Sequence, residues 1–178
     1  MSRYIGDSPS RADIALQQWR RECPEFDASV MSLFGRLVEA SEMFDKLHLA
    51  PLNKMYSLQR GEFDVLATLR RSGKPYTLSP TELYRSLMVS SGGMTNRLDR
   101  LEKSGLVRRR RSREDRRAII VELTNEGLKK IDVMLKEHLS GQEKLLEKLG
   151  SEQRKAMNGL LATLIESMSE QEKMKGIR

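Results

Sequence analysis

The chain has 178 residues, of which 38% are hydrophobic and 32% are charged, and it carries a formal net charge of +7. This length suits about one domain, and no apolar run approaches the roughly 20 residues that a membrane-spanning helix needs. Cys23 is the only cysteine, which excludes an intramolecular disulfide, and the N-terminus lacks a secretory apolar segment. We therefore expect a cytoplasmic protein without a membrane partner.

Two helices are expected before residue 57. Ser10 can cap the first helix with Asp13 as its third residue, and Pro24 should stop it. Asp27 is predicted to cap the second helix. Its apolar residues recur three and four positions apart from Val30 to Leu47, and the pattern breaks at residues 49–51.

The next segment predicts one more helix and a turn into a two-helix unit. Ser57 or Gln59 should begin that helix, and Ser72–Gly73 should end it. Residues 74–77 can then form a short extended segment. Within the helix, the inward side is predicted to carry Phe63, Leu66 and Ala67.

Residues 78–105 predict a helix-turn-helix. Ser79 can cap a short helix whose first residue is Pro80, and Ser90 and Ser91 should start a second helix over residues 92–104. Gly105 can end the second helix in the left-handed conformation.

The second helix has one apolar side and one polar side. Met94, Leu98 and Leu101 share the side that should pack into the domain. Asn and Arg can pair with adenine and guanine edges, while Ser, Thr and Lys can hold phosphates. The DNA-contact candidates on the two helices are Ser79, Thr81, Ser90, Ser91, Gly92, Thr95, Asn96, Arg100 and Lys103.

A basic hairpin is expected directly after the second helix. The run Arg108–Arg111 leads into turn-like residues 112–117, and the β-rich residues 118–123 bring the chain back. From Arg97 to Arg117 there are ten Lys or Arg and four Asp or Glu, a local charge of +6. Because nearly all the excess charge sits on this unit, it predicts salt-sensitive phosphate binding beside a helix in the major groove.

Two long helices should follow, one from residues 124–125 and one from Ser151. Their apolar stripes are too long for one small domain to bury, so we expect a homodimer with a two-fold axis. The predicted fold is mainly α with a small β-wing, a winged helix-turn-helix. Its three parts are N-terminal helices (1–56), a DNA-binding lobe (57–124) and C-terminal dimerisation helices (125–178).

Catalytic patterns are absent from the sequence. It has no phosphate-binding glycine loop, no G-x-S-x-G elbow and no paired metal-ligand motif. His48 and His138 lie far apart, and each is expected at a surface or an interface. We expect no enzyme activity, no cofactor and no metal.

Residues 57–127 resemble the MarR family of bacterial transcription factors. The resemblance rests on Asp115-Arg116-Arg117 followed by residues 121–127, Val-Glu-Leu-Thr-Asn-Glu-Gly. It implies a dimeric winged helix in which Asp115 orients a wing arginine and Arg116 or Arg117 enters the minor groove. Ser112 and Glu114 depart from the common wing, which has an acidic residue and an arginine there. The wing candidates for DNA binding are Arg113, Asp115, Arg116 and Arg117.

Three further stretches, residues 18–22, 63–71 and 94–101, are similar to the urate-responsive branch of that family, the PecS- and HucR-like regulators. This resemblance implies an additional N-terminal helix bearing a tryptophan and a ligand cleft near the DNA-binding lobe. By matching position, it gives Trp19, Asp64 and Arg97 as ligand contacts. Arg71 is a fourth, although Arg70 can be aligned in its place.

Helical periodicity supports the ligand assignment independently. Arg97 lies about 60° from the buried stripe of its helix and can turn inward, whereas Arg100 lies further toward the DNA side. An anionic purine such as urate would suit Arg97 for charge and Trp19 for stacking, and another purine or an aromatic acid fits the same groups. Ligand would then release a repressor from a palindromic operator.

Three other interpretations stay open. The charged ligand candidates can instead form an ion pair that only holds two helices together. Cys23, close to Arg20 and Arg21, can act as a redox switch in the same fold. A winged helix can also serve as a protein-interaction scaffold, which predicts no salt-sensitive DNA binding.

Overall fold

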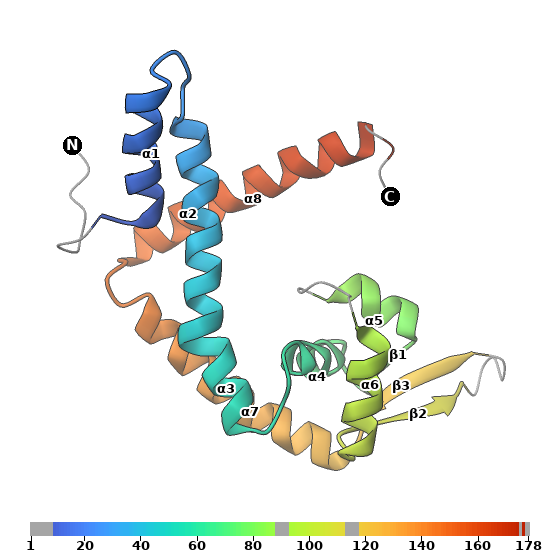
Figure 1. Cartoon of the computed structure of the whole chain (residues 1–178). Coiled ribbons are helices and arrows are strands. Elements are labelled where there is room, and N and C mark those ends of the chain that lie inside the picture. Colours follow the sequence, from blue (N-terminus) through green and yellow to red (C-terminus); the bar gives the residue numbers. More distant parts are fainter. Residues whose placement is uncertain (1–8, 88–92, 113–117, 175, 177–178) are drawn as a thin grey trace. The chain divides into compact units, whose positions relative to one another are not determined.

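The computed structural model describes residues 9–87, 93–112, 118–174 and 176. These residues form helices and one three-stranded antiparallel sheet (Figure 1). The chain divides into two compact units, residues 1–135 and residues 136–178, and each is described by itself. None of the helices in the described ranges is long and apolar enough to cross a membrane.

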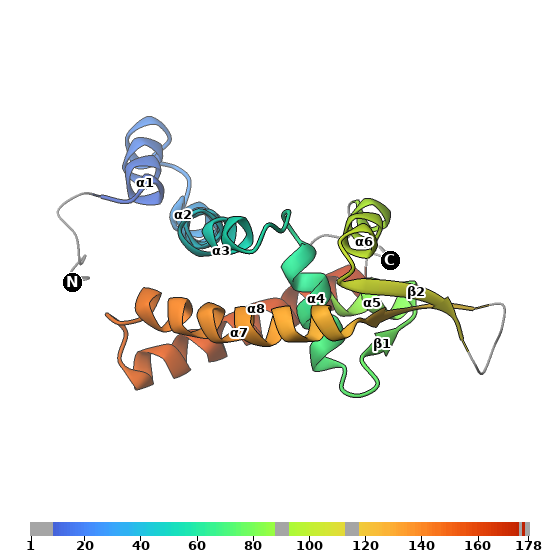
Figure 2. The same ribbon diagram turned by 90° about the horizontal axis from the view of Figure 1, so that it is seen from below.

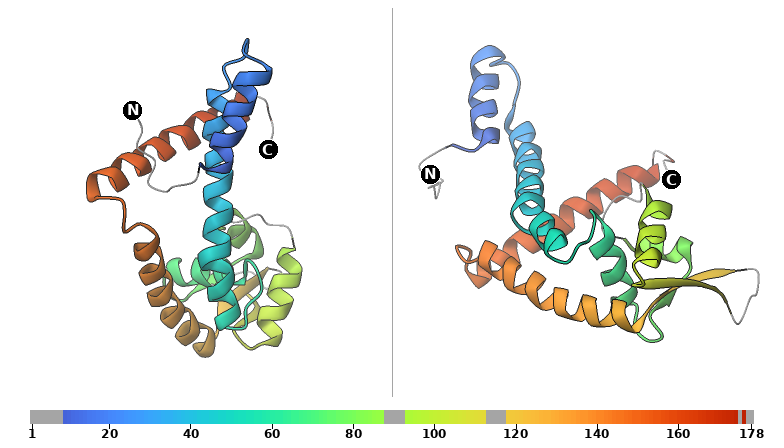
Figure 3. Two further views of the ribbon diagram at one scale, coloured as in Figure 1. Left: turned by 60° about the vertical axis from the view of Figure 1, so that its left-hand side comes forward. Right: turned by 60° about the horizontal axis from the view of Figure 1, so that its bottom comes forward.

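The first unit begins with two helices that lie side by side, α1 (Arg11–Glu22) and α2 (Ser29–Phe44) (Figure 3). The predicted capping box is confirmed, because Ser10 and Asp13 exchange hydrogen bonds at the start of α1. Arg36 of α2 pairs with the buried Asp13, and Arg11 Nε lies 3.3 Å from Glu39 Oε1. The two helices are therefore joined by ion pairs.

Two predictions about α2 were wrong in detail. Ala28, not Asp27, is the N-cap residue, although Asp27 Oδ1 accepts the N–H of Ser29 at 3.0 Å. The helix also does not break at residues 49–51. A π-helical turn, η1 (Asp45–Leu49), leads directly into α3 (Ala50–Met55), and Pro51 is the second residue of α3. His48, expected at a surface or an interface, is buried beside Phe44.

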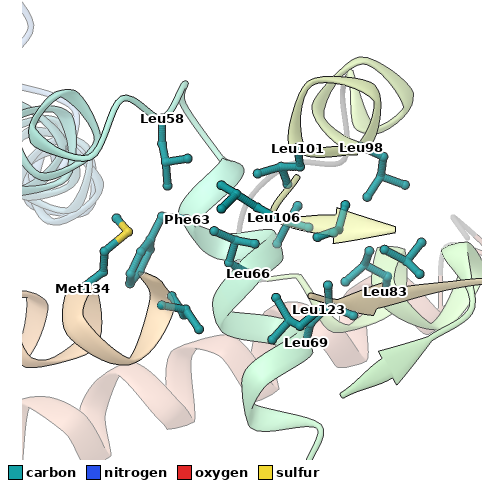
Figure 4. Close-up of a cluster of buried hydrophobic side chains, with 14 of the residues drawn as sticks. Leu58, Phe63, Leu66, Leu69, Leu83, Leu98, Leu101, Leu106, Leu123 and Met134 are labelled. Carbon is teal, nitrogen blue, oxygen red and sulfur yellow. The ribbon is translucent and has the colours of Figure 1, made fainter. Parts of the chain in front are cut away.

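Helix α4 (Glu62–Arg71) forms the centre of the main hydrophobic core. Leu66 and Leu69 are fully buried and lie between side chains from α6, the sheet and α7 (Figure 4). The helix starts later than predicted, after Gly61 rather than at Ser57 or Gln59. The delay arises because Gln59 is held in a turn, its N–H bonding the Glu62 carboxylate at 2.7 Å.

The helix-turn-helix follows a short strand, β1 (Thr77–Leu78). Helix α5 (Pro80–Ser86) is capped by Ser79 as predicted. Helix α6 (Met94–Lys103) begins two residues later than expected, because Gly93 adopts a left-handed conformation (φ 76°) and serves as its N-cap. Leu98 and Leu101 face the core, and Gly105 is left-handed after the helix, both as predicted.

The hairpin consists of β2 (Val107–Arg111) and β3 (Ile119–Leu123), and the strand order in the sheet is β1-β3-β2. In the register of the sheet, Arg109 of β2 lies opposite Val121 of β3, and Thr77 of β1 lies opposite Glu122 of β3. The hairpin extends away from the core beside α6 (Figure 2). These elements confirm the predicted mainly helical winged helix-turn-helix.

Helix α7 (Asn125–Leu145) starts at the base of the hairpin. Thr124 Oγ1 accepts the N–H of Gly127 at 3.0 Å and donates to the Gly105 carbonyl at 2.6 Å. This threonine therefore connects the end of α6 to the start of α7. The second unit holds the end of α7 and α8 (Ser151–Met174), and Arg154 of α8 pairs with Glu143 of α7 at 2.7 Å across the turn that joins them.

A glycine substitution tests how closely α7 approaches the hairpin. A Cβ atom at Gly127 would lie 1.9 Å from the Leu106 carbonyl oxygen, which is backbone and has little room to move. Gly127→Ala should therefore reduce the free energy of unfolding by about 2–3 kcal/mol, despite the better helix propensity of alanine. Gly159→Ala in α8 is the matched control, since nothing lies within 4 Å of its added Cβ. The control should gain about 0.5–1 kcal/mol in urea denaturation; equal effects of the two changes would contradict the close approach.

Candidate DNA interface and ligand site

The N-terminus of α5 is held by reciprocal hydrogen bonds. Ser79 Oγ accepts the N–H of Glu82 at 3.2 Å, and the Glu82 carboxylate accepts the N–H of Ser79 at 2.8 Å. The hydrogen bond from the Ser79 backbone lowers the pKa of Glu82. Ser79, a DNA candidate, thus has a capping role as well, while Thr81 beside it is exposed.

Helix α6 presents its polar candidates outward. Thr95, Asn96 and Lys103 are exposed, whereas Leu98 and Leu101 on the other side are buried. Side chains that can reach base edges and phosphates therefore lie together on one face. The candidates Ser90, Ser91, Gly92, Arg113, Asp115, Arg116 and Arg117 lie outside the described residues.

The arginines on one side of β2 are paired with a single carboxylate on β3. Arg108 Nη2 lies 2.9 Å from Glu122 Oε1, and Arg110 Nε lies 2.6 Å from Glu122 Oε2. These guanidinium groups, Arg108 first, hold the pKa of Glu122 below its usual range despite its partial burial. Part of the basic run is therefore neutralised within the protein.

Arg109 faces the other way and fastens the hairpin to α6. Its guanidinium lies 2.6 Å from both the Asp99 and the Glu102 carboxylates, and its backbone N–H bonds Glu102 at 2.7 Å. The local net charge of +6 does not reveal these pairs, because a sum of charges does not say which side chains contact each other. Strand alternation was the available signal: residues 108 and 110 share one face, and residue 109 takes the other.

Arg100, predicted to face DNA, also binds the start of α4. Its Nε donates to Glu62 Oε1 at 2.6 Å, and the other oxygen of Glu62 accepts the N–H of Gln59. The Glu62 side chain is only 5% exposed, whereas that of Arg100 is 47% exposed. The guanidinium thus joins α6 to α4 while part of it remains accessible. No sequence pattern had singled out Glu62.

The structure brings two of the ligand candidates to the same end of α4. Arg97 is half-buried, and its guanidinium lies against Gly61, the residue that precedes α4. Asp64 is in the first turn of that helix. The approach of α6 to α4 therefore places Arg97 at the helix end that carries Asp64.

The other two candidates lie elsewhere. Arg71 follows Asp64 by seven residues, about 10 Å along the helix axis, and donates to the Ser86 carbonyl at the end of α5. Trp19 is on α1 and is 41% exposed. Within the described residues, no hydrogen bond or ring contact joins Trp19 to the other three. Arg70, the alternative to Arg71, instead pairs with Asp132 at 2.7 Å.

A surface hollow of about 420 Å³ lies at the junction between α3 and α4. Its wall includes Asn53, whose buried Oδ1 has no hydrogen-bond partner among the described residues, and Arg60, next to Gly61. None of the four predicted ligand residues lines this hollow. The hollow is therefore not the site that those four residues predict.

The remaining sequence candidate is Cys23, the alternative redox switch. Cys23 is half-buried at the end of α1, and its backbone N–H bonds the Trp19 carbonyl at 2.8 Å. The described residues contain no group of three His, Cys, Asp or Glu side chains able to hold a metal ion.

Comparison with known proteins identifies the family. Residues 56–118 match the MarR family. Over 161 residues, 90% of this chain and 93% of the relative, the chain is 38% identical to the HTH-type transcriptional regulator PecS of Dickeya dadantii. The chain belongs to the MarR family.

Two further matches agree. The chain is 32% identical to the HTH-type transcriptional repressor YetL of Bacillus subtilis, covering 80% of this chain and 84% of the relative. The crystal structure of NadR in complex with 4-hydroxyphenylacetate is 25% identical, with a TM-score of 0.57 over 74% of this chain and 89% of that one. PecS and YetL are transcriptional regulators and not enzymes, in agreement with the prediction.

The Glu122 pairs predict a pH effect. Because the folded-state pKa of Glu122 lies below its ordinary value of 4.5, its stabilisation is complete above that value and is lost as pH falls through the folded pKa. Glu122→Gln should cost about 1 kcal/mol at pH 7 and should show a smaller loss of stability between pH 5 and 3 than the unmodified chain. Urea denaturation across that range measures both. Glu126→Gln, which removes the carboxylate of an exposed pair with Lys129, controls for the loss of one surface charge. An acid loss as large in Glu122→Gln as in the unmodified chain would contradict the assignment.

Proposed function

We propose that this chain is a ligand-responsive transcriptional regulator that binds double-stranded DNA as a homodimer. The observation that carries the proposal is the exposed polar face of α6, with Thr95, Asn96 and Lys103, beside a hairpin rich in arginine. Such a face suits the major groove, and the hairpin suits the adjacent backbone and minor groove. The 38% identity to PecS over 90% of the chain supports the same function.

Exposed apolar side chains on the terminal helices support the dimer. Val30, Met31 and Val38 of α2 are each more than half exposed, and on α8 Leu160 and Ile165 are 73% and 63% exposed. Rows of such residues on single helices are costly in water and favour burial by a second copy. Two copies related by a two-fold axis would present two recognition helices, and such a pair fits a palindromic operator.

The proposed effector is a small planar anion such as urate. Arg97 supplies a half-buried positive charge at the start of α4, where Asp64 provides a carboxylate. Arg97 also stands on α6 itself, so a ligand engaging it acts directly on the recognition helix. NadR has a similar fold, and its crystal structure is a complex with an aromatic anion, 4-hydroxyphenylacetate. Trp19 and Arg71 would join the site only through a rearrangement or a second subunit.

The proposed mechanism is repression released by ligand. The free dimer occupies its operator and blocks transcription. Ligand bound at Arg97 and Asp64 lowers operator affinity, which requires that the ligand binds the DNA-incompetent state more tightly.

Salt dependence tests DNA binding. Operator affinity, measured by fluorescence anisotropy with a duplex from the chain's own promoter, should fall by about a thousandfold between 50 and 200 mM salt because phosphate contacts release counterions. A duplex of the same length and scrambled sequence is the control and should bind more weakly at every salt concentration. No binding at low salt would overturn the proposal in favour of a protein-interaction scaffold.

An arginine substitution tests the ligand response. Arg97→Ala should retain operator binding within about threefold but lose release by urate, because the charge that holds the anion is gone. Arg60→Ala is the matched control, as its side chain is 84% exposed in a loose pair with Asp45 at the same turn. The control should still be released. If Arg97→Ala responds to urate as the unmodified chain does, the ligand assignment is wrong.

A further inference from the structure

Gly61 has two unusual features, its backbone conformation and its neighbour. It is buried, with φ at +80°, and it immediately precedes α4. A Cβ atom built on it would meet three atoms of Arg97 first: Cζ and Nε at 2.7 Å, and Nη2 at 3.0 Å. The side chain of Arg97 therefore occupies the space that any other residue at position 61 would need.

The three distances also define the orientation of the guanidinium. Cζ lies between the nitrogens of the group, so an approach to its edge in the plane would leave Cζ clearly farther away than the nearest nitrogen. Cζ is instead as near as Nε and nearer than Nη2. The Gly61 position hence lies over the flat face of the guanidinium. The N–H groups then point sideways, within a plane set by the backbone beneath.

The conformation of Gly61 alone does not demand this open space. Gly73, with φ at +81°, has nearly the same φ angle, yet nothing lies within 4 Å of its added Cβ. Gly61 thus meets two requirements at once, the left-handed turn and the close approach of Arg97. Glu62, the next residue, holds Arg100 one turn further along α6.

We propose that Gly61 is a positioning residue that sets the plane of the Arg97 guanidinium and so sets the plane in which a planar anion binds. A guanidinium held flat on the backbone offers two parallel N–H groups to a carboxylate or a purine anion lying in the same plane. The predicted effect on ligand binding rests on the proposed function, whereas the contact between Gly61 and Arg97 does not.

Substitution of the two glycines tests the consequence. Urate binding to the full-length protein, measured by calorimetry, should weaken about tenfold or more in Gly61→Ala, because the added methyl group displaces the guanidinium. Gly73→Ala places a side chain at a similar left-handed φ without the clash and should bind urate within twofold of the unmodified chain. Equal urate affinity in the two variants would overturn the proposal.

A double-substitution cycle tests the geometry without any ligand. Gly61→Ala should lower the Tm by about 3 °C more than Gly73→Ala does, and this excess should vanish when both are placed in an Arg97→Ala background. No excess in the presence of Arg97, or an excess that persists without it, would overturn the proposal. If Gly61→Ala alone does not fold, recovery of folding in Gly61→Ala with Arg97→Ala supports it, and failure of that double variant contradicts it.

The two assays separate this inference from the proposed function. An unmodified chain that does not bind urate removes urate as the effector, and the thermal cycle then decides the role of Gly61. If the unmodified chain binds urate and the Gly61→Ala and Gly73→Ala variants bind it with equal affinity, the proposed function stands and the role of Gly61 is wrong.

Discussion

The buried carboxylate of Glu62 is the interaction on which the arrangement of the DNA-binding lobe depends. One oxygen accepts the N–H of Gln59 and closes the turn before α4, and the other accepts Arg100 Nε from α6. A carboxylate only 5% exposed is costly to leave unpaired. The start of the central helix and the position of the recognition helix are therefore fixed by the same side chain. Arg97, one turn earlier on α6, lies against Gly61 at the same end of α4.

The hairpin is organised by a second set of ion pairs. Arg109 joins β2 to α6 through Asp99 and Glu102, and Arg108 and Arg110 share Glu122 within the sheet. These pairs are partly exposed and each contributes modestly to stability. Their main effect is geometric. The Arg109 pairs hold the hairpin against α6, so the two parts of the proposed DNA interface keep one orientation.

Much of this architecture follows from local rules in the sequence. The capping boxes at Ser10 and Ser79, the buried face of α6 and the two wing strands were predicted from spacing and residue type, and the structure has them.

The errors concern places where tertiary contacts or backbone conformation override local signals. The π-helical turn carries α2 past Pro51, and left-handed glycines delay the starts of α4 and α6. Glu62 and Gly61 escaped notice because a buried carboxylate and a close approach depend on which helix packs opposite. For the ligand site, the structure brings Arg97 and Asp64 to one end of α4. Arg71 lies at the other end of the same helix, because helical spacing gives the face of a residue but not its nearness to another residue on that face. Trp19 lies on a different helix, whose packing the spacing does not predict.

The Glu122 pairs also affect how such a protein would search a chromosome. A DNA-binding protein meets about 10⁶–10⁹ competing sites for each operator, and free arginines would hold it at all of them through phosphate attraction. Arg108 and Arg110 each already have a carboxylate at 2.9 Å or less, so contact with a phosphate exchanges one anion for another and gains little. Arbitrary DNA would then be released quickly, and the time spent on each wrong site would be short. Glu122 would weaken the attraction of these two arginines to any DNA phosphate, and would in this way shorten the search for the operator.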